Sequence, residues 1–160
     1  SDVPARVAEG CLFADGGAHV VDIMLWLGGA PAAEVVAFMD ATAPETERYV
    51  SVQARLANGV LVSISESDID GLEDDQMTVV GDRGVLKRNT TGAWLQTVAG
   101  REEIKSEGAD LYPAIPFVNS ILDGMPCPIP AEAGAHAAAF SEAAYRSAVE
   151  KRIVSLSSPS

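Results

Sequence analysis

The sequence predicts an α+β fold in which helices pack on one face of an open, mainly antiparallel sheet. Two observations support this class. One helical pattern comes first, a series of strand patterns follows, and two helical patterns come near the end of the chain. Elements segregated in this way are typical of α+β domains. Apolar and polar residues alternate within the clearest strand patterns, which indicates that one face of the sheet is buried. The length of 160 residues fits a single domain, 1–160.

The first helix is predicted to begin at Asp15 or Gly16, after an entry segment, residues 1–14, that we expect to be partly extended. Its apolar positions recur at helical spacing: Val20, Val21, Met24, Leu25 and Leu27. The pair Gly28–Gly29, followed by Pro31, predicts the end of the helix, because a left-handed glycine and a nearby proline commonly terminate helices.

A run of strands comes next. Ala33–Met39 is short and apolar, and Tyr49–Leu56 alternates cleanly. Asn58-Gly59 then predicts a hairpin with a type I′ turn, because both central residues of that turn need positive φ. The alternation resumes from Val60 to Ser65.

The middle of the chain is predicted to hold an acidic loop, Ser67–Asp75, and then further strands. The predicted strands are Met77–Val80 and Val85–Lys87 around the turn Gly81–Gly84, with weaker ones at Ala93–Val98 and Glu103–Lys105.

Two helices and a short strand are predicted to end the fold. The helices are Ala114–Asp123, stopped by Gly124, and Glu132–Lys151, with the strand Ile153–Leu156 after them. The buried stripe of the long helix is predicted to contain Ala137, Phe140, Ala144 and Ala148. The outer sheet face should carry Ser51, Gln53, Arg55 and Ser63. Such a face is either solvated or paired with a second subunit.

Charge and cysteine usage narrow the class of partners and the compartment. A net charge of −12, without a cluster of basic residues, argues against nucleic acid and against anionic membrane surfaces. No apolar stretch approaches the length of a membrane helix. Cys11 and Cys127 are expected to be free, buried thiols, which favours a reducing compartment and a cytoplasmic protein.

Asp15 and His19 are the candidate catalytic residues. They lie four positions apart at the start of a helix, which places both side chains on one helix face. A carboxylate can orient an imidazole and stabilise its charged form, while the imidazole acts as general base or acid near neutral pH. On spacing alone, a helix cap at Asp15 and a structural histidine are the more common interpretation.

The other polar residues give weaker signals. Asp22 is expected to be a structural acid that hydrogen-bonds a neighbouring loop, and His136 to be a surface or packing residue. No metal site is predicted, because nothing resembles the spacing of a zinc helix. Gly81–Gly84 is interpreted as a turn, since it lacks the G-x-G-x-x-G spacing and opens no helix. No cofactor-binding residue is therefore predicted in this chain.

The stretch Asp15-x-Gly17-x-His19-x-x-Asp22, followed by Leu25-Trp26-Leu27-x-Gly29, resembles the D-x-G-x-H-x-x-D…W-L-x-G signature of the Gfo/Idh/MocA (glucose–fructose oxidoreductase / inositol dehydrogenase) family. Further segments are similar to family motifs, in order: Val35–Ala37, Ala57–Val60, Val79–Leu86, Phe117–Gly124 and Glu142–Ala148. The resemblance runs from about residue 9 to residue 156, and its ordered set of motifs is more specific than any one of them.

The resemblance implies a dihydrodipicolinate reductase-like or glyceraldehyde-3-phosphate dehydrogenase-like C-terminal domain. Proteins of this family bind NAD or NADP in an N-terminal Rossmann domain and oxidise or reduce sugars and polyols, commonly with a lysine from that domain. By this resemblance, His19 would accept the proton of the substrate hydroxyl and Asp15 would orient and support it. The family's C-terminal sheet commonly mediates dimer or tetramer assembly, so a homo-oligomer through the sheet face is expected.

The chain departs from the family pattern by lacking the G-x-G-x-x-G fingerprint and the E-K-P lysine. We therefore expect the N-terminal Rossmann domain to be absent from this chain, and the 160 residues alone to bind no NAD(P) and to be inactive. The alternative is a non-catalytic binding or dimerisation module of the same fold. Neither the substrate nor the choice between NAD and NADP can be predicted from this chain.

Overall fold

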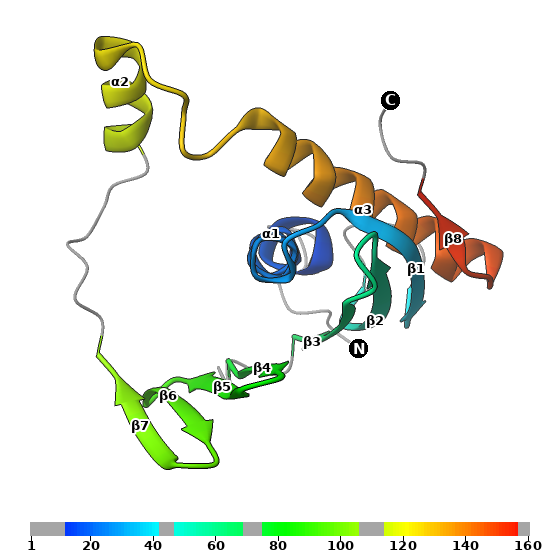
Figure 1. Ribbon diagram of the computed structural model, residues 1–160. Helices are drawn as coiled ribbons and strands as arrows, with labels where there is room; N and C mark the ends of the chain where they lie inside the picture. The colour runs from blue at the N-terminus through cyan, green and yellow to red at the C-terminus, as the bar shows by residue number, and fades with distance from the viewer. Residues whose placement is uncertain (1–11, 42–46, 69–74, 106–113, 157–160) are drawn as a thin grey trace. The chain divides into compact units, whose positions relative to one another are not determined.

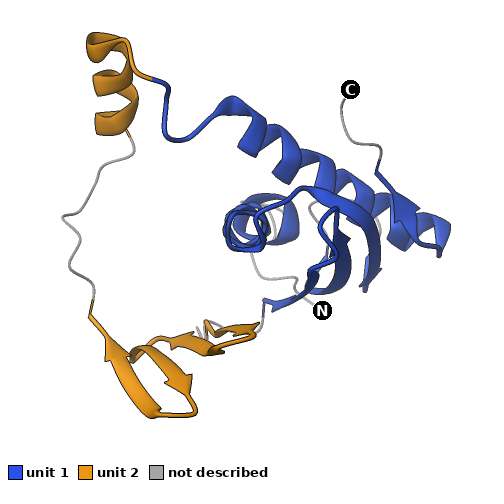
Figure 2. Cartoon of the chain, viewed as in Figure 1, with its two compact units in different colours: residues 1–69, 126–160 blue, residues 70–125 orange. Residues whose placement is uncertain are grey.

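A computed structural model describes residues 12–41, 47–68, 75–105 and 114–156 of the chain. The chain divides into two compact units, one formed by Ser1–Ile69 with Pro126–Ser160 and the other by Asp70–Met125 (Figure 2). Both units contain antiparallel strands and helical segments, so the α+β class is confirmed.

In the first unit, helices pack on one face of a four-stranded antiparallel sheet (Figure 1). The strands run in the order β3-β2-β1-β8. The elements of this unit are η2 (Leu12–Gly16), α1 (Gly17–Gly28), β1 (Ala32–Met39), β2 (Tyr49–Leu56), β3 (Leu61–Ser67), α3 (Ala131–Glu150) and β8 (Val154–Ser155). The last strand is shorter than predicted, because β8 pairs with β1 at only two positions.

The first helix begins earlier than predicted, with a π-helical turn. Leu12–Gly16 forms η2, which runs directly into α1, so residues 12–14 of the predicted entry segment are helical. Residues 1–11 of that segment lie outside the described residues. Phe13 is fully buried, so this first turn is held against the core by its aromatic side chain.

The helix ends where the sequence predicts. Gly29 adopts a left-handed conformation with φ of 70°. Its N–H donates to the carbonyl oxygens of Leu25, at 2.9 Å, and Trp26, at 3.3 Å. These bonds satisfy carbonyl groups that the end of a helix otherwise leaves without partners.

The hairpin predicted at Asn58 and Gly59 is confirmed, but its turn is not of type I′. Gly59 has a φ of 89°, whereas Asn58 does not adopt positive φ. The side-chain oxygen of Asn58 instead accepts a hydrogen bond from the N–H of Val60 at 3.2 Å, as in an Asx turn. Its amide nitrogen donates to the carbonyl of Gly28 at 2.8 Å, which ties the hairpin to the end of α1.

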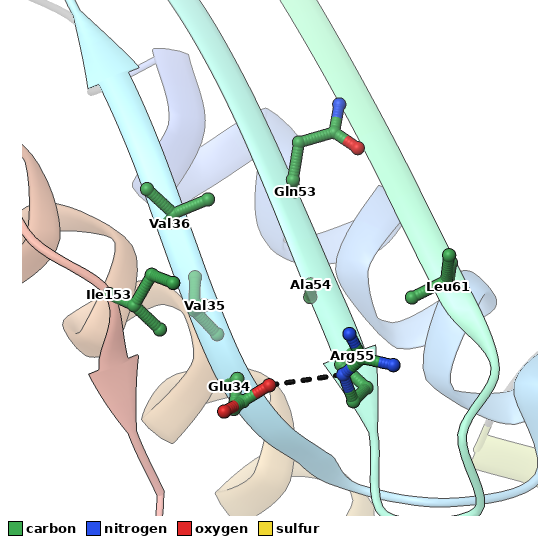
Figure 3. A pocket seen from close by; sticks show the side chains of 8 residues that line it. All are labelled: Glu34, Val35, Val36, Gln53, Ala54, Arg55, Leu61 and Ile153. Carbon is green, nitrogen blue, oxygen red and sulfur yellow. Dashed lines mark hydrogen bonds and ion pairs between the residues drawn. The ribbon is translucent and has the colours of Figure 1, made fainter.

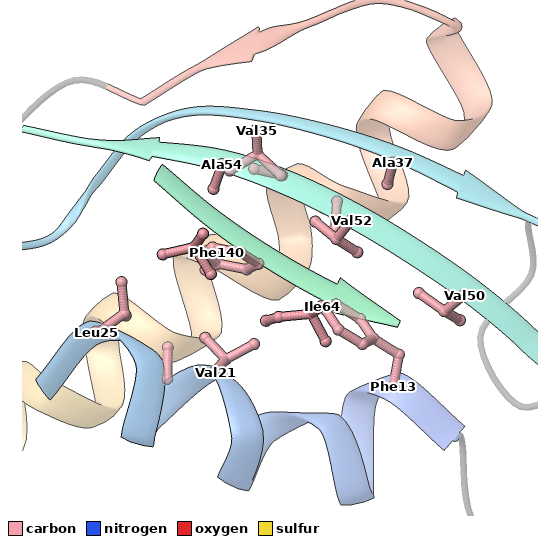
Figure 4. Close-up of a cluster of buried hydrophobic side chains, with 14 of the residues drawn as sticks. Phe13, Val21, Leu25, Val35, Ala37, Val50, Val52, Ala54, Ile64 and Phe140 are labelled. Carbon is pink, nitrogen blue, oxygen red and sulfur yellow. The ribbon is translucent and has the colours of Figure 1, made fainter. Parts of the chain in front are cut away.

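The core of the first unit lies between the sheet and the helices α1 and α3 (Figure 4). Buried and exposed residues alternate along β2 from Tyr49 to Leu56, as the sequence predicts. Helices and strands both contribute large buried side chains, among them Phe13, Val21, Val35, Val52, Leu56 and Phe140.

The buried stripe of α3 differs from its prediction at one position. Ala137, Phe140 and Ala144 are buried as expected, but Ala148 is only half-buried. Ser147 is fully buried instead, and its hydroxyl accepts a hydrogen bond from the N–H of Ala37 on β1 at 3.0 Å, which satisfies the buried polar group. The small residues of the stripe allow α3 to pack closely on β1.

The second unit contains an antiparallel sheet with strands in sequential order. Its elements are β4 (Met77–Gly81), β5 (Gly84–Asn89), β6 (Gly92–Thr97), β7 (Gly100–Ile104) and α2 (Ala114–Asp123). The predicted strands and the predicted helix are all found, with shifts of a few residues at strand ends. The strands in the described ranges thus form two sheets, a division that the sequence analysis did not predict.

None of the helices in the described ranges is long and apolar enough to span a membrane.

Candidate functional site

Asp15 and His19 both lie on the solvent side of the first helical segment. Asp15 belongs to η2 and His19 to the first turn of α1, and both are exposed. Val21 and Leu25, on the opposite side of α1, are buried in the core. In the described part of the chain, neither Asp15 nor His19 makes a side-chain hydrogen bond or ion pair. Within the described ranges, their side-chain polar atoms therefore have no protein partner.

Asp15 does not act as the cap of the helix. The residue at the N-cap position of α1 is Gly16, which has helical backbone angles and no side-chain capping bond. Asp15 lies within the preceding π-turn. The more common interpretation of an aspartate at a helix start is therefore wrong here, and Asp15 lacks that structural role.

Asp22 does not make the contact that the sequence analysis expected. It is exposed, and no loop residue within the described ranges hydrogen-bonds to it. Asp22, His19 and Trp26 recur at three- and four-residue spacing, so they share one face of α1. Trp26 is 79% exposed. Two ionisable groups and a large aromatic side chain thus stand on a helix face that nothing covers within the first unit's described residues.

A buried glutamate anchors the turn that carries Asp15. Glu47 is 4% exposed, and its Oε1 accepts a hydrogen bond from the N–H of Phe13 at 3.3 Å. The hydroxyl of Tyr145 on α3 donates to the same oxygen at 2.5 Å. The rings of Phe13 and Tyr145 meet edge to face, with centroids 6.2 Å apart. Asp15 is therefore two residues from a position tied to α3.

Sequence reasoning missed Glu47, because its partners are 34 and 98 positions away. The sequence signal that points to this network is the segment Glu142–Ala148, which contains Tyr145 and resembles a family motif. The carboxylate also suits its place electrostatically, since negative charge near a helix N-terminus is favourable.

Close packing requires glycine at position 17. A Cβ built on Gly17 would lie 2.6 Å from Cδ2 of Phe13 and 2.9 Å from Oε2 of Glu66. Real Cβ atoms do not approach other heavy atoms so closely. Gly17, between Asp15 and His19 in the sequence, thus lets the backbone lie directly against the side chains of Phe13 and Glu66.

The outer face of the first sheet is exposed, as predicted from Ser51, Gln53, Arg55 and Ser63. A shallow pocket lies on it, in which Arg55 Nε is 3.1 Å from Glu34 Oε2 (Figure 3). Nε2 of Gln53 donates to Oγ of Ser63 at 2.6 Å. The face also exposes Phe38, by 77%, and Leu61, by 71%. It is therefore less polar than the sequence analysis expected.

The remaining candidates were interpreted as structural in the sequence analysis. Within the described ranges, no three His, Cys, Asp or Glu side chains cluster as metal ligands would. His136 is half-buried on α3. Cys127 is free but only half-buried, which corrects the expected burial, and Cys11 lies outside the described residues. Gly81–Gly84 forms the turn between β4 and β5, as expected.

A family model matches more than half of the chain. Residues 3–87 match the model described as the GFO/IDH/MocA C-terminal domain. None of the curated proteins matches the sequence.

Solved structures share the fold across most of the chain. UDP-N-acetylglucosamine 3-dehydrogenase GnnA from Acidithiobacillus ferrooxidans has a TM-score of 0.79 and 17% identity, over 89% of this chain and 49% of its own. The WlbA dehydrogenase from Bordetella pertussis, in complex with NADH and UDP-GlcNAcA, has a TM-score of 0.70 and 23% identity, over 94% and 46%. Aldose-aldose oxidoreductase from Caulobacter crescentus, complexed with glycerol, has a TM-score of 0.75 and 17% identity, over 88% and 46%. The chain therefore spans about half the length of these structures, and the likeness shows the fold.

Proposed function

Because the chain belongs to the GFO/IDH/MocA C-terminal domain family, we propose that it is the substrate-side domain of an NAD(P)-dependent oxidoreductase. The proposed substrate is a sugar, a polyol or a related hydroxy compound. The observation that carries the proposal is the placement of Asp15 and His19: both side chains are exposed, on a segment that Phe13, Glu47 and Tyr145 hold against the core.

In this proposal, His19 accepts the proton of the substrate hydroxyl. Oxidation of an alcohol removes a hydride from carbon and a proton from oxygen, and a nicotinamide cofactor supplies the acceptor for the hydride when bound. A neutral imidazole can take up such a proton near neutral pH. Asp15, on the same helical segment, is the proposed partner that orients the ring in the intact enzyme and stabilises the imidazolium that results.

The cofactor does not fit the described residues of this chain. Dinucleotide sites use a glycine-rich turn between a strand and a helix, whose N-terminus holds the pyrophosphate. The turn Gly81–Gly84 joins two strands instead. We therefore place the NAD or NADP site on a separate N-terminal Rossmann domain, and expect the 160 residues alone to bind no cofactor and to be inactive. The structural neighbour WlbA was solved with NADH and UDP-GlcNAcA, which supports a nicotinamide cofactor for the intact enzyme.

The exposed face of α1 supports a partner domain on that side. His19, Asp22 and Trp26 stand together on it, and a tryptophan that is 79% exposed is typical of an interaction surface. A domain that covered this face would enclose the imidazole together with the substrate and exclude bulk water.

The second candidate function is a non-catalytic binding or dimerisation module. The exposed Phe38 and Leu61 on the outer sheet face favour it, because a homo-oligomer through this face would bury both side chains. The two functions are compatible in one protein, since the catalytic candidates and this face lie on opposite sides of the sheet.

The proposal predicts that a longer protein containing this chain and a nucleotide-binding domain reduces NAD or NADP with a polyol or sugar. The 160 residues alone should not do so. In the longer protein, His19→Ala should abolish most of the activity. An intact, folded protein without activity toward any hydroxy compound would leave the binding module as the better assignment. The cytoplasm remains the predicted location.

A further inference from the structure

Glu66 occupies a position where the strand pattern predicts an apolar residue. On β3, Val62 and Ile64 point into the core and are 7% and 4% exposed. Glu66 continues the same alternation, and its register partner on β2 is the buried Val50. A carboxyl group therefore points toward the side of the sheet that the helices cover.

Both carboxyl oxygens of Glu66 are buried and, among the described residues, lack a hydrogen-bond partner. Oε2 lies against Gly17, because a Cβ atom added to that glycine would be only 2.9 Å from Oε2. Withdrawal from water disfavours the charged carboxylate and raises the pKa of Glu66 from 4.5 to about 7. A buried polar group without a partner is costly, so its presence calls for an explanation.

Among the described residues, no charged group forms a hydrogen bond with Glu66 that would offset its ionisation. The elements around it carry these titratable groups: Asp15 on η2, His19 and Asp22 on α1, Arg48 just before β2, Tyr49 and Arg55 on β2, Asp68 after β3, and Glu47 with Tyr145 beside Phe13. Within the described ranges, none of them bonds to Glu66. Of the two arginines in this set, Arg48 donates to the carbonyl of Asp68, and Arg55 pairs with Glu34.

We propose that Glu66 is a positioning residue for His19. In its uncharged form, the carboxyl packs beneath Gly17 and holds the turn between Asp15 and His19 in place. When it ionises, water must reach the carboxylate, and this backbone moves away from it. The role depends on the proposed function, because position matters here only if His19 receives a proton.

The test follows the titration of Glu66 and the position of Gly17 independently of catalysis. In the 160-residue chain, NMR would record the Glu66 carboxyl carbon, the Gly17 amide and the His19 ring from about pH 5 to about pH 9. The chemical shift of the Gly17 amide should change over the same pH range as that of the Glu66 carboxyl carbon. Glu66→Gln should remove this change, which is called the Gly17 step below. Glu102→Gln, which changes an exposed strand glutamate, should leave it intact.

The second part of the test measures catalysis in the longer protein, which contains this chain and a nucleotide-binding domain. Glu66→Gln should raise kcat/KM relative to wild type by about threefold to tenfold above about pH 8, since small displacements of a catalytic group cost that much or more. It should leave kcat/KM at about pH 6 within about twofold of wild type. A purely structural glutamate would not produce such a pH-dependent ratio.

The two proposals fail in different ways. A Gly17 step that persists in Glu66→Gln, or no step at all, overturns the role of Glu66. The role is also overturned if the ratio of kcat/KM in Glu66→Gln to kcat/KM in wild type is the same at both pH values. Absence of dehydrogenase activity in the longer protein overturns the proposed function and, with it, a role toward His19, whether or not the Gly17 step is observed.

Discussion

The hydroxyl of Tyr145 donates a 2.5 Å hydrogen bond to Oε1 of Glu47, and through that oxygen the long helix α3 is tied to the first turn of the candidate site. The same oxygen accepts the N–H of Phe13. Helix α3 therefore supports Asp15 and His19 without contributing a side chain to their exposed face.

Tyr145→Phe should weaken both the fold and the site. It removes the donor to a buried carboxylate while keeping the ring that meets Phe13, so the loss should be about 1–3 kcal/mol of unfolding free energy. Urea unfolding would measure it. Tyr49→Phe is the matched control, because Tyr49 is 47% exposed and its change should cost about 0.5 kcal/mol or less. Equal losses in the two variants would contradict an anchoring role for Tyr145.

Gly17→Ala should be destabilising, whereas Gly16→Ala should not. A methyl group at position 17 would collide with Phe13 and Glu66, and such overpacking costs about 1–3 kcal/mol. At position 16 nothing lies within 4 Å and φ is −61°, so alanine should be neutral or stabilise by up to about 1 kcal/mol. Thermal unfolding of the two variants would compare them. A Gly17→Ala variant that is more stable than Gly16→Ala would contradict the close packing at position 17.

His19→Ala should separate activity from stability. The side chain is exposed and makes no hydrogen bond within the described ranges, so the unfolding free energy should change by about 0.5 kcal/mol or less. In the longer protein, kcat/KM should fall by about 10²- to 10⁴-fold, the usual contribution of a general base. His136→Ala, on α3, should leave kcat/KM near that of wild type. A large loss of stability in His19→Ala would argue for a structural histidine.

The sequence predicts local features well because their causes lie within a few residues. The end of α1 follows from Gly29, and the hairpin follows from Asn58 and Gly59. Even there, the turn is not the expected type I′ turn but an Asx turn, in which the side-chain oxygen of Asn58 accepts a hydrogen bond from the N–H of Val60. The position of Asp15 and His19 on one helical segment was predicted from their spacing.

What the sequence did not predict depends on distant partners. Glu47 meets Tyr145 across 98 positions, and Glu66 meets Gly17 across the packing of a strand on a helix. Neither glutamate was singled out from the sequence, because the contacts that distinguish them are not local. Similarly, the division into two sheets depends on which strands pair, and alternation alone indicates a buried face without naming its neighbours.

Ser147→Ala tests a hydrogen bond that ties α3 to β1. The hydroxyl of Ser147 accepts the N–H of Ala37 at 3.0 Å and donates to the carbonyl of Arg152 at 2.6 Å. Alanine would leave a buried backbone N–H without a partner, which should cost about 1–3 kcal/mol. Ser51→Ala, on the exposed face of β2, is the control and should cost about 0.5 kcal/mol or less. Amide exchange of Ala37 should accelerate only in Ser147→Ala.

Stability should depend on pH through Glu66. Its pKa in the folded chain, about 7, lies above the ordinary value of 4.5, so the protonated carboxyl favours the fold. This contribution is complete below about pH 4.5 and is lost as the pH rises through about 7. Glu66→Gln cannot ionise, so its melting temperature should gain on that of wild type between about pH 5 and about pH 8. If the melting temperatures of the two proteins instead change in parallel with pH over that range, Glu66 is already ionised or solvated in the folded chain at low pH.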